Sequence, residues 1–358
     1  MLREKSISLL RELTEAPGAP GAEDAVRDIF KRYIKSEIKT DKMGSIYTRC
    51  KGTYDTPGIM LSAHLDEVGF VVQSLTSDGY IKFLTLGGVW GPVLLSQRVR
   101  ILTDEQEIPG VVVAKPPHFL SDDERTKEMQ PDNMYIDVGA ESVEDLISTF
   151  KIQLGHTIVF DSGFAPLHHP GRFVAKAFDN RVGVGLVIQS AQELMNLDHP
   201  NTVYCGANSQ EELGGRGAHT AVHMIAPDIG IILEGIPADD LPKSEKDTHQ
   251  GALGKGIQIR VLDPGTLMNR RLNQFIIEVA NELNVPYQIA VRRSGGTDAK
   301  AIHLNDFGVP TAVLGIPVRY AHTANSIMDI SDYLNGLKLI REIIKRLDST
   351  ICESFTQY

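Results

Sequence analysis

Four apolar runs of this chain each lead, directly or after a short loop, into acidic or imidazole side chains. The runs and the residues that follow them are 58–63 before His64, 202–208 before Glu211 and Glu212, 229–233 before Glu234, and 310–315 before His322. Short apolar runs with such boundaries are typical of buried strands. Because an open α/β sheet binds ligands outside the carboxyl ends of its strands, we expect these side chains to face a common crevice.

Segments with helical periodicity alternate with these strands. The expected helices are 3–15, 22–36, 180–196, 216–225, 268–283 and 331–348, and further strands are expected at 256–262 and 286–292. Strands that alternate with helices of this length predict an α/β fold. We expect a mixed, largely parallel sheet that is flanked by helices on both faces.

The stretch 69–165 has a different texture. Its β-branched runs QRVRILTD, GVVVAK and HTIVFD alternate with clusters of Gly, Pro and Asp, which predicts a small β-rich module. The polar segment 118–133 is expected to be a loop. The simplest architecture is one α/β domain built from residues 1–68 and 166–358, with the β-rich domain inserted over 69–165.

Composition excludes several classes of protein. The chain has 358 residues, about right for two domains, and a formal net charge of -10, which argues against nucleic-acid and anionic-membrane partners. It contains no run of about 18 consecutive apolar residues, so no membrane span is expected. The charged N-terminal segment predicts an amphipathic helix and not a secretory signal. Three widely spaced cysteines (Cys50, Cys205 and Cys352) fit a reducing compartment, so we expect a cytoplasmic protein.

Each candidate site residue has an ordinary explanation when it is taken alone. His64 could be a hydrogen-bonded histidine at a strand end, and Asp179 could cap the helix that follows it. Glu211 and Glu212 could lie in a solvated acidic loop, although adjacent carboxylates are costly unless a cation lies beside them. The interpretation changes only because all these residues are expected at one edge of one sheet.

Two imidazoles and at least three carboxylates form a set of ligands that suits zinc, cobalt or manganese. Calcium and magnesium prefer shells made only of oxygen. Two metal ions bridged by a carboxylate are a common arrangement for hydrolytic displacement, and a spare carboxylate beside them can act as general base.

With these residues assembled, the chain resembles the tetrahedral aminopeptidase family, which includes the glutamyl aminopeptidases. The matching segments are SAHLDEVGF (62–70), AKAFDNRVG (175–183), SQEELGGRGA (209–218), IILEG (231–235), SGGTDAKAIH (294–303) and IPVRYAHTANSI (316–327). They occur in the order of the family and cover essentially the whole chain. The resemblance implies a zinc-peptidase-like fold and a dinuclear metallopeptidase that removes N-terminal residues from peptides.

The resemblance also implies two divalent ions per subunit, with zinc expected and cobalt or manganese as alternatives. Asp179 would bridge both ions. His64 and Glu234 would complete the ligands of one ion, and Glu212 and His322 would complete those of the other.

The remaining roles follow from the same resemblance. Glu211 would be the general base that deprotonates the bridging water, so that a bridging hydroxide attacks the peptide carbonyl, and Asp66 would orient and polarise His64. The inserted module would be a PDZ-like β-barrel involved in dimerisation. The dimers of this family commonly assemble into a hollow tetrahedral dodecamer, so we expect a homo-oligomer.

Three positions depart from the family pattern. Glu234 stands where Asp is usual, and Glu reaches one methylene further. Asn180 stands where a second Asp is common, and its amide cannot carry the negative charge. Lys300 replaces a small residue, and it would either favour acidic substrate side chains or point to solvent.

Other functions remain open on the sequence alone. A deacylase or another amidohydrolase could use the same metal site on a non-peptide amide. A glycosidase would use paired carboxylates, but this reading leaves His64 and His322 unexplained. A non-catalytic scaffold would hold metal without cleaving peptides, and a complete set of ligands with a base argues against it. The resemblance leaves the preferred N-terminal residue open, since glutamyl, leucyl and lysyl selectivities all occur in the family.

Overall fold

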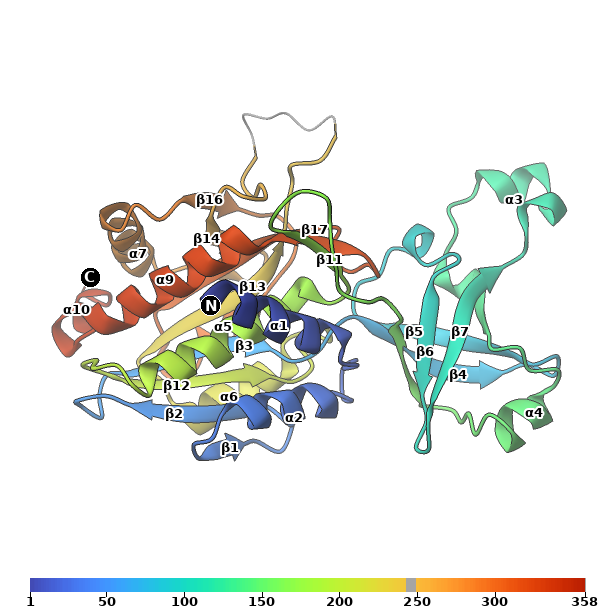
Figure 1. The fold of residues 1–358 in the computed structure, drawn as a ribbon, viewed down its shortest axis with the longest axis horizontal. Coiled ribbons are helices and arrows are strands. Elements are labelled where there is room, and N and C mark those ends of the chain that lie inside the picture. Colours follow the sequence, from blue (N-terminus) through green and yellow to red (C-terminus); the bar gives the residue numbers. More distant parts are fainter. Residues whose placement is uncertain (243–248, 358) are drawn as a thin grey trace.

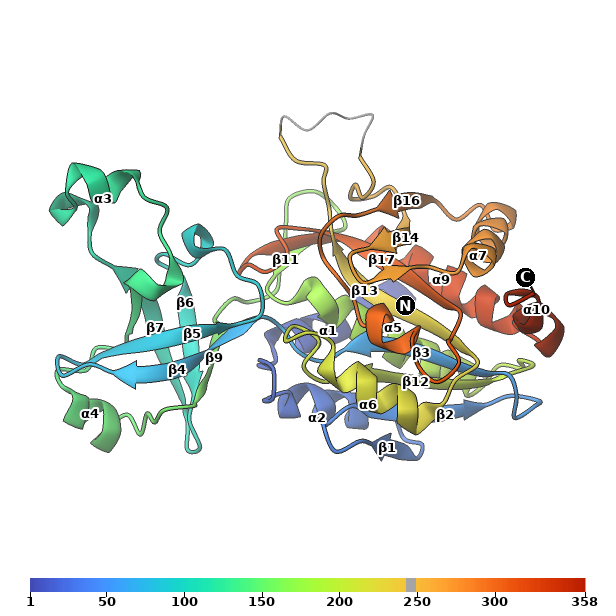
Figure 2. The same ribbon diagram turned by 180° about the vertical axis from the view of Figure 1, so that it is seen from behind.

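The structure, a computed structural model, describes residues 1–242 and 249–357. It consists of a large α/β body and a smaller β-barrel that projects from one end of that body (Figure 1; Figure 2, seen from behind). Both chain termini belong to the large body, and the barrel is formed by the blue-green middle of the first half of the chain. In the described part of the chain, no helix is both long and apolar enough to cross a membrane.

The body is built on one sheet, to which the described residues contribute twelve strands. The strands are β1 (Ile38–Thr40), β2 (Ile46–Lys51), β3 (Gly58–His64), β10 (Ala165–Pro166), β11 (Arg172–Ala175), β12 (Thr202–Asn208), β13 (Ile229–Pro237), β14 (Ile257–Asp263), β15 (Thr266–Leu267), β16 (Tyr287–Val291), β17 (Thr311–Arg319) and β18 (Ser326–Asp329). The main order is β1-β2-β12-β3-β13-β17-β18-β11-β10, with β14 beside β17 and both β15 and β16 beside β14. The central strands β12, β3, β13 and β17 are parallel, whereas the strands at the flanks pair mostly antiparallel.

Helices cover both faces of this sheet, which explains why its central strands are continuous apolar runs. The helices of the body are α1 (Leu2–Glu15), α2 (Asp24–Tyr33), α5 (Phe178–Leu194), α6 (Arg216–Ile225), α7 (Arg270–Glu282), α8 (Ala299–Ile302), α9 (Ile330–Arg346) and α10 (Ser349–Ser354). Along β3, Ile59 and Leu61 join the core beneath α1, α5 and α9, while Met60 joins the opposite core beneath α6 and α8. The predicted mixed, largely parallel α/β fold is therefore confirmed.

The barrel is closed by six strands in the order β4-β5-β8-β7-β6-β9. The bounds are β4 (Gly69–Leu75), β5 (Tyr80–Leu86), β6 (Arg98–Leu102), β7 (Glu107–Ala114), β8 (Met134–Asp137) and β9 (Thr157–Phe160), with the short helices η1 (Gly91–Val93), η2 (Pro117–Phe119), α3 (Asp122–Thr126), η3 (Pro131–Asn133) and α4 (Val143–Ser148) between them. Its core is separate from those of the body and centres on Phe70, whose ring makes edge contacts with Phe83 and Phe160.

The structure adds local detail to the predictions. The segment 118–133, predicted to be a loop, contains α3 and η3, and neither the edge strand β1 nor its neighbour β2 was predicted. The division of the chain into two domains and the role of the barrel in dimerisation stay predictions.

Candidate metal centre

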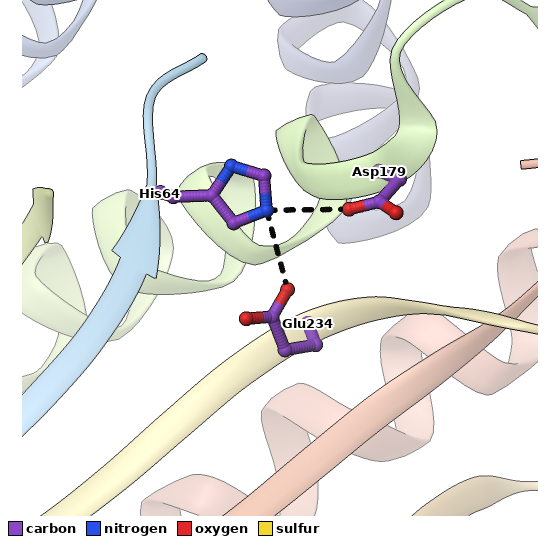
Figure 3. A group of neighbouring side chains, drawn as sticks. All are labelled: His64, Asp179 and Glu234. Atoms are coloured by element: carbon purple, nitrogen blue, oxygen red, sulfur yellow. Dashed lines mark ion pairs between the residues drawn. The ribbon is translucent and has the colours of Figure 1, made fainter. Parts of the chain in front are cut away.

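The carboxyl ends of the central parallel strands bring the candidate side chains together. His64 ends β3, Glu234 lies in β13, and Glu211 and Glu212 lie in the loop after β12. The fifth and sixth residues of the group are Asp179, at the start of α5, and His322, in the loop after β17. Figure 3 shows His64, Asp179 and Glu234 pointing toward one another from three different elements.

Two clusters of donor atoms share Asp179. In the first, His64 Nε2 lies 3.3 Å from Asp179 Oδ1 and 3.5 Å from Glu234 Oε2. In the second, His322 Nε2 lies 3.3 Å from Asp179 Oδ2 and 3.2 Å from Glu212 Oε1. The two carboxylate oxygens of Asp179 thus face different imidazoles, which is the arrangement expected of a carboxylate shared by two sites.

Main-chain carbonyls fix the orientation of both imidazoles. His64 Nδ1 lies 3.1 Å from the main-chain oxygen of Asp66, and His322 Nδ1 lies 2.6 Å from that of Gly88. A carbonyl accepts, so each Nδ1 carries a hydrogen, and each Nε2 is the nitrogen that faces the carboxylates and could bind a metal ion. Metal-binding histidines usually show this arrangement.

The Gly88 contact comes from the barrel side of the chain, from the loop after β5. At the preceding residue, Gly87, a Cβ atom would come within 3.1 Å of Glu212 Oε2, and φ is +95°. This loop therefore approaches the second cluster closely, and its carbonyl contact has no side-chain signature that the sequence could have revealed.

Asp66 joins the ends of β3 and β12. Its Oδ1 accepts a hydrogen bond from the amide of Glu211 at 2.9 Å, and its Oδ2 accepts one from the amide of Glu212 at 3.0 Å. Oδ1 also lies 3.4 Å from His64 Nδ1, and the side chain of Asp66 is fully buried. Asp66 thus holds the Glu211–Glu212 loop in place as well as lying beside His64.

Replacing Asp66 with Asn is expected to lower metal affinity or kcat about 10–100-fold, as changes to the hydrogen-bond partners of ligands usually do. Both main-chain amides, of Glu211 and Glu212, now donate to an oxygen of Asp66. The NH₂ group of Asn would face one of these amides with a donor in place of an acceptor. The measurement is kcat at saturating metal together with a metal titration. Activity and affinity like those of the wild type would contradict this role.

The Asp179 segment is held against β13. Gly235 permits the close approach, because a Cβ atom there would come within 2.9 Å of Asp179 Cα. Asn180 donates a hydrogen bond to the main-chain oxygen of Leu233 at 2.9 Å and accepts one from the amide of Gly183 at 3.0 Å. A deprotonated Asp could not donate to Leu233, so the departure at Asn180 has a structural use next to Glu234.

Charge coupling within the cluster shifts the pKa values of the imidazoles. Burial disfavours the charged form of His64, but Glu234, Asp179 and Asp66 outweigh burial and raise the pKa of His64 well above its usual range. Burial is likewise outweighed at His322, where Asp179 and Glu212 raise the pKa to about 11. The two imidazoles in turn lower the pKa of Asp179 despite its burial.

The glutamates shift in the opposite direction. Burial raises the pKa of Glu234 to about 7 and raises the pKa of Glu211 well above its usual range. Burial also raises the pKa of Glu212, while His322 opposes that shift. Without a cation, the site therefore holds protons that a metal ion would displace.

The donor set fits metal ions. Ligand atoms at about 2.0–2.1 Å from a tetrahedral ion lie about 3.3 Å apart, close to the spacings in both clusters. Glu234 Oε1 is buried and has no hydrogen-bond partner within the described residues, so this oxygen is available as a metal ligand. Glu211 forms a third group with His64 and Glu212, so it borders the same space.

These residues line a cavity of about 240 Å³. The rest of its lining is Gly214, Gly235, Ile236, Pro237, Arg260, Gly295, Gly296, Thr297 and Lys300. Arg260 was not among the site residues predicted from the sequence. Its position within the apolar strand 256–262 could have indicated a role, because a buried charge requires a partner or a function.

The site combines nitrogen and oxygen ligands with a further carboxylate, and it lies at the carboxyl edge of an α/β sheet. This arrangement is typical of metal-dependent hydrolases. Residues 44–339 match the M42 glutamyl aminopeptidase family, and the chain belongs to that family. It is accordingly an aminopeptidase, a hydrolase of a metal-dependent family. The predicted resemblance and enzyme class are confirmed.

Individual relatives agree with this assignment along the whole chain. A lysyl aminopeptidase of Pyrococcus furiosus is 34% identical over 95% of this chain and 96% of its own length. A TET aminopeptidase from a marine sediment thaumarchaeon has a TM-score of 0.96 at 38% identity, covering 99% of this chain and 100% of its own. The Pyrococcus horikoshii TET1 peptidase, which can assemble into a tetrahedron or a large octahedral shell, has a TM-score of 0.85 at 26% identity, covering 96% of this chain and 100% of its own.

Proposed function

We propose that the chain removes N-terminal residues from peptides with two divalent metal ions held by the two clusters. His64 and Glu234 would hold one ion, Glu212 and His322 would hold the other, and Asp179 would be shared. The observation that carries this proposal is the position of Asp179, whose two oxygens each lie 3.3 Å from a different imidazole nitrogen. Two imidazoles with three carboxylates favour zinc, with cobalt or manganese as alternatives.

When bound, a pair of divalent ions supplies Lewis-acid activation of the peptide carbonyl and of the attacking water. The chain supplies the proton transfers. Glu211 is the proposed general base: it takes the proton of the attacking water and returns it to the leaving amine. Its burial and raised pKa suit a group that must gain and lose a proton near neutral pH. Asp66 positions Glu211 through its main-chain amide.

We also propose the two-domain organisation, with the barrel over 69–165 as the dimerisation domain and residues 1–68 and 166–358 as the catalytic domain. The outer face of the barrel exposes apolar side chains, with Leu84 45% and Val111 38% exposed. We propose a homo-oligomer, a dodecamer built from dimers; a dodecamer of PhTET1 and the tetrahedron or octahedral shell of the P. horikoshii relative support a large assembly. A cytoplasmic location is supported by the three cysteines, all buried and free of disulfides.

The test is hydrolysis of aminoacyl-p-nitroanilides by chelator-stripped protein, before and after addition of zinc, cobalt or manganese. We expect no turnover without metal, restored turnover with metal, and a stoichiometry of two ions per chain in a metal titration. N-acetylated anilides are the control, and they should not be cleaved. Release of acetate from the acetylated substrates, without release of p-nitroaniline from the free ones, would instead identify a deacylase. No cleavage with any metal would contradict the proposal.

A further inference from the structure

Two cations line the active-site cavity in addition to the proposed metal ligands. Apart from those ligands and Glu211, the charged residues among its described lining are Arg260 and Lys300, both cations. The uncharged residues of the lining include Gly214, Gly295, Gly296 and Thr297, together with the apolar Ile236 and Pro237. Apart from the proposed ligands and Glu211, the described lining contains no acidic side chain, so a ligand beside Arg260 or Lys300 would meet positive charge.

Arg260 is buried in β14, with 2% of its surface exposed. Its Nη1 donates to the main-chain oxygen of Gly295 at 2.8 Å, but its Nε is buried and has no partner within the described residues. Asp263 is distant at 3.9 Å and already accepts hydrogen bonds from Thr297 and Gly265. Arg260 therefore has one ion pair, at the long distance of 3.9 Å, and its Nε is a buried donor without an acceptor among the described residues, which is costly.

Lys300 reaches the cavity from α8 along a path that two glycines leave open. A Cβ atom at Gly265 would come within 2.7 Å of Lys300 Cβ, and one at Gly215 would come within 2.9 Å of Lys300 Cε. Its Nζ would lie 3.9 Å from a Cβ atom at Gly214, which itself lines the cavity. Lys300 Nζ has no hydrogen bond or ion pair with any described residue, although it lies close enough to affect the pKa of buried Asp298.

We propose that Arg260 and Lys300 form the subsite for the first side chain of the peptide and select substrates that begin with Glu or Asp. This inference rests on the proposed function and names its substrate class. A substrate carboxylate would supply the acceptors that both cations lack, through charge-assisted hydrogen bonds. A leucyl side chain would leave Arg260 Nε without an acceptor, and a lysyl side chain would add a like charge.

The family does not decide this preference. The family takes its name from a glutamyl aminopeptidase, whereas a relative 34% identical to this chain is a lysyl aminopeptidase. The selectivity therefore depends on the residues that each chain places in the cavity. The sequence left open whether Lys300 faces the substrate or the solvent. In the structure, its stem is packed between Gly215 and Gly265, and the residue lines the cavity.

The experiment compares kcat/KM of the metal-loaded enzyme for glutamyl-, aspartyl-, leucyl- and lysyl-p-nitroanilide. We expect the acidic substrates to be cleaved most efficiently and the lysyl substrate least. Lys300→Gln should lower the ratio of glutamyl to leucyl kcat/KM about tenfold, the loss expected for one hydrogen bond to a charged group. Lys300→Glu should shift the preference further, toward the lysyl substrate. Anilides have no peptide carboxylate, so they report on the first side chain alone.

The matched control is Lys345→Gln, which removes an exposed lysine on α9 that pairs with Glu342. It should leave the ratio unchanged. A wild-type enzyme that prefers leucyl or lysyl substrates, or a Lys300→Gln ratio equal to that of the wild type, would overturn the inference and leave the aminopeptidase function standing. A Lys300→Gln effect that appears on Leu-Gly but not on its C-terminal amide would also overturn it, because the cation would then bind the peptide's carboxyl end. Failure to cleave any anilide would contradict the proposed function itself.

Discussion

Replacing Glu211 with Gln is expected to lower kcat by about 10²–10⁴-fold while the metal content of the protein stays unchanged. The carboxamide has almost the same size, and the main-chain hydrogen bond from residue 211 to Asp66 does not depend on the side chain. The substituted side chain cannot accept the proton of the attacking water. Glu211 is not part of either cluster that contains Asp179, so its loss should leave both ions bound. The measurements are kcat at saturating metal and metal content after dialysis.

The neighbouring residue supplies the matched control. Glu212 lies 3.2 Å from His322 Nε2 within the second cluster, and Glu212→Gln should therefore lose metal as well as activity. Turnover like that of the wild type in Glu211→Gln would defeat the assignment of the base. Loss of metal from Glu211→Gln, with retention by Glu212→Gln, would show that the two roles are exchanged.

The central part of the fold could be predicted because burial on both faces leaves a strong pattern. β3 is buried at every position and β12 at nearly every one, and the expected bounds at 202–208 agree with the structure. Strand β2 was missed because it alternates between apolar and charged residues, as in Arg49 and Lys51. Such a short strand near the sheet edge carries little signal until its partners are known, since pairing with β1 and β12 fixes it.

The candidate site could be predicted only in its residue types. The side chains of His64 and Glu234 follow apolar runs, and the sheet brings such positions together. The contacts that orient them involve main-chain groups, such as the oxygen of Gly88 and the amides bound by Asp66. Any residue type provides those groups, so no sequence pattern could have indicated them. The position of Arg260 in the cavity likewise depends on the pairing of β14 with β17, which could not be predicted from the sequence.

Metal binding is expected to become stronger, and its effect on stability larger, as the pH rises from 6 to 8. In the metal-free protein, the pKa of His322 is raised to about 11 and that of His64 is also raised. These shifts give stability that is fully present below the unfolded pKa of about 6.5 and is lost as the pH rises toward the folded values. Glu234, with a pKa of about 7, also holds its proton more tightly when folded, so its contribution falls between about pH 4.3 and pH 7.

A metal ion requires the same groups without their protons, so binding releases protons and the apparent Kd should fall about tenfold per pH unit for each proton released. The metal-free protein therefore loses stability over the same range in which the metal gains affinity, and the rise in Tm caused by a fixed cobalt concentration should grow with pH. Thermal unfolding with and without cobalt at pH 6, 7 and 8 measures this effect, and calorimetry in buffers of different ionisation enthalpy counts the protons. His322→Gln removes one protonated ligand, so its proton release should be smaller by about one. A metal-induced shift that stays constant or shrinks as the pH rises would contradict the assignment of these imidazoles and carboxylates as the ligands.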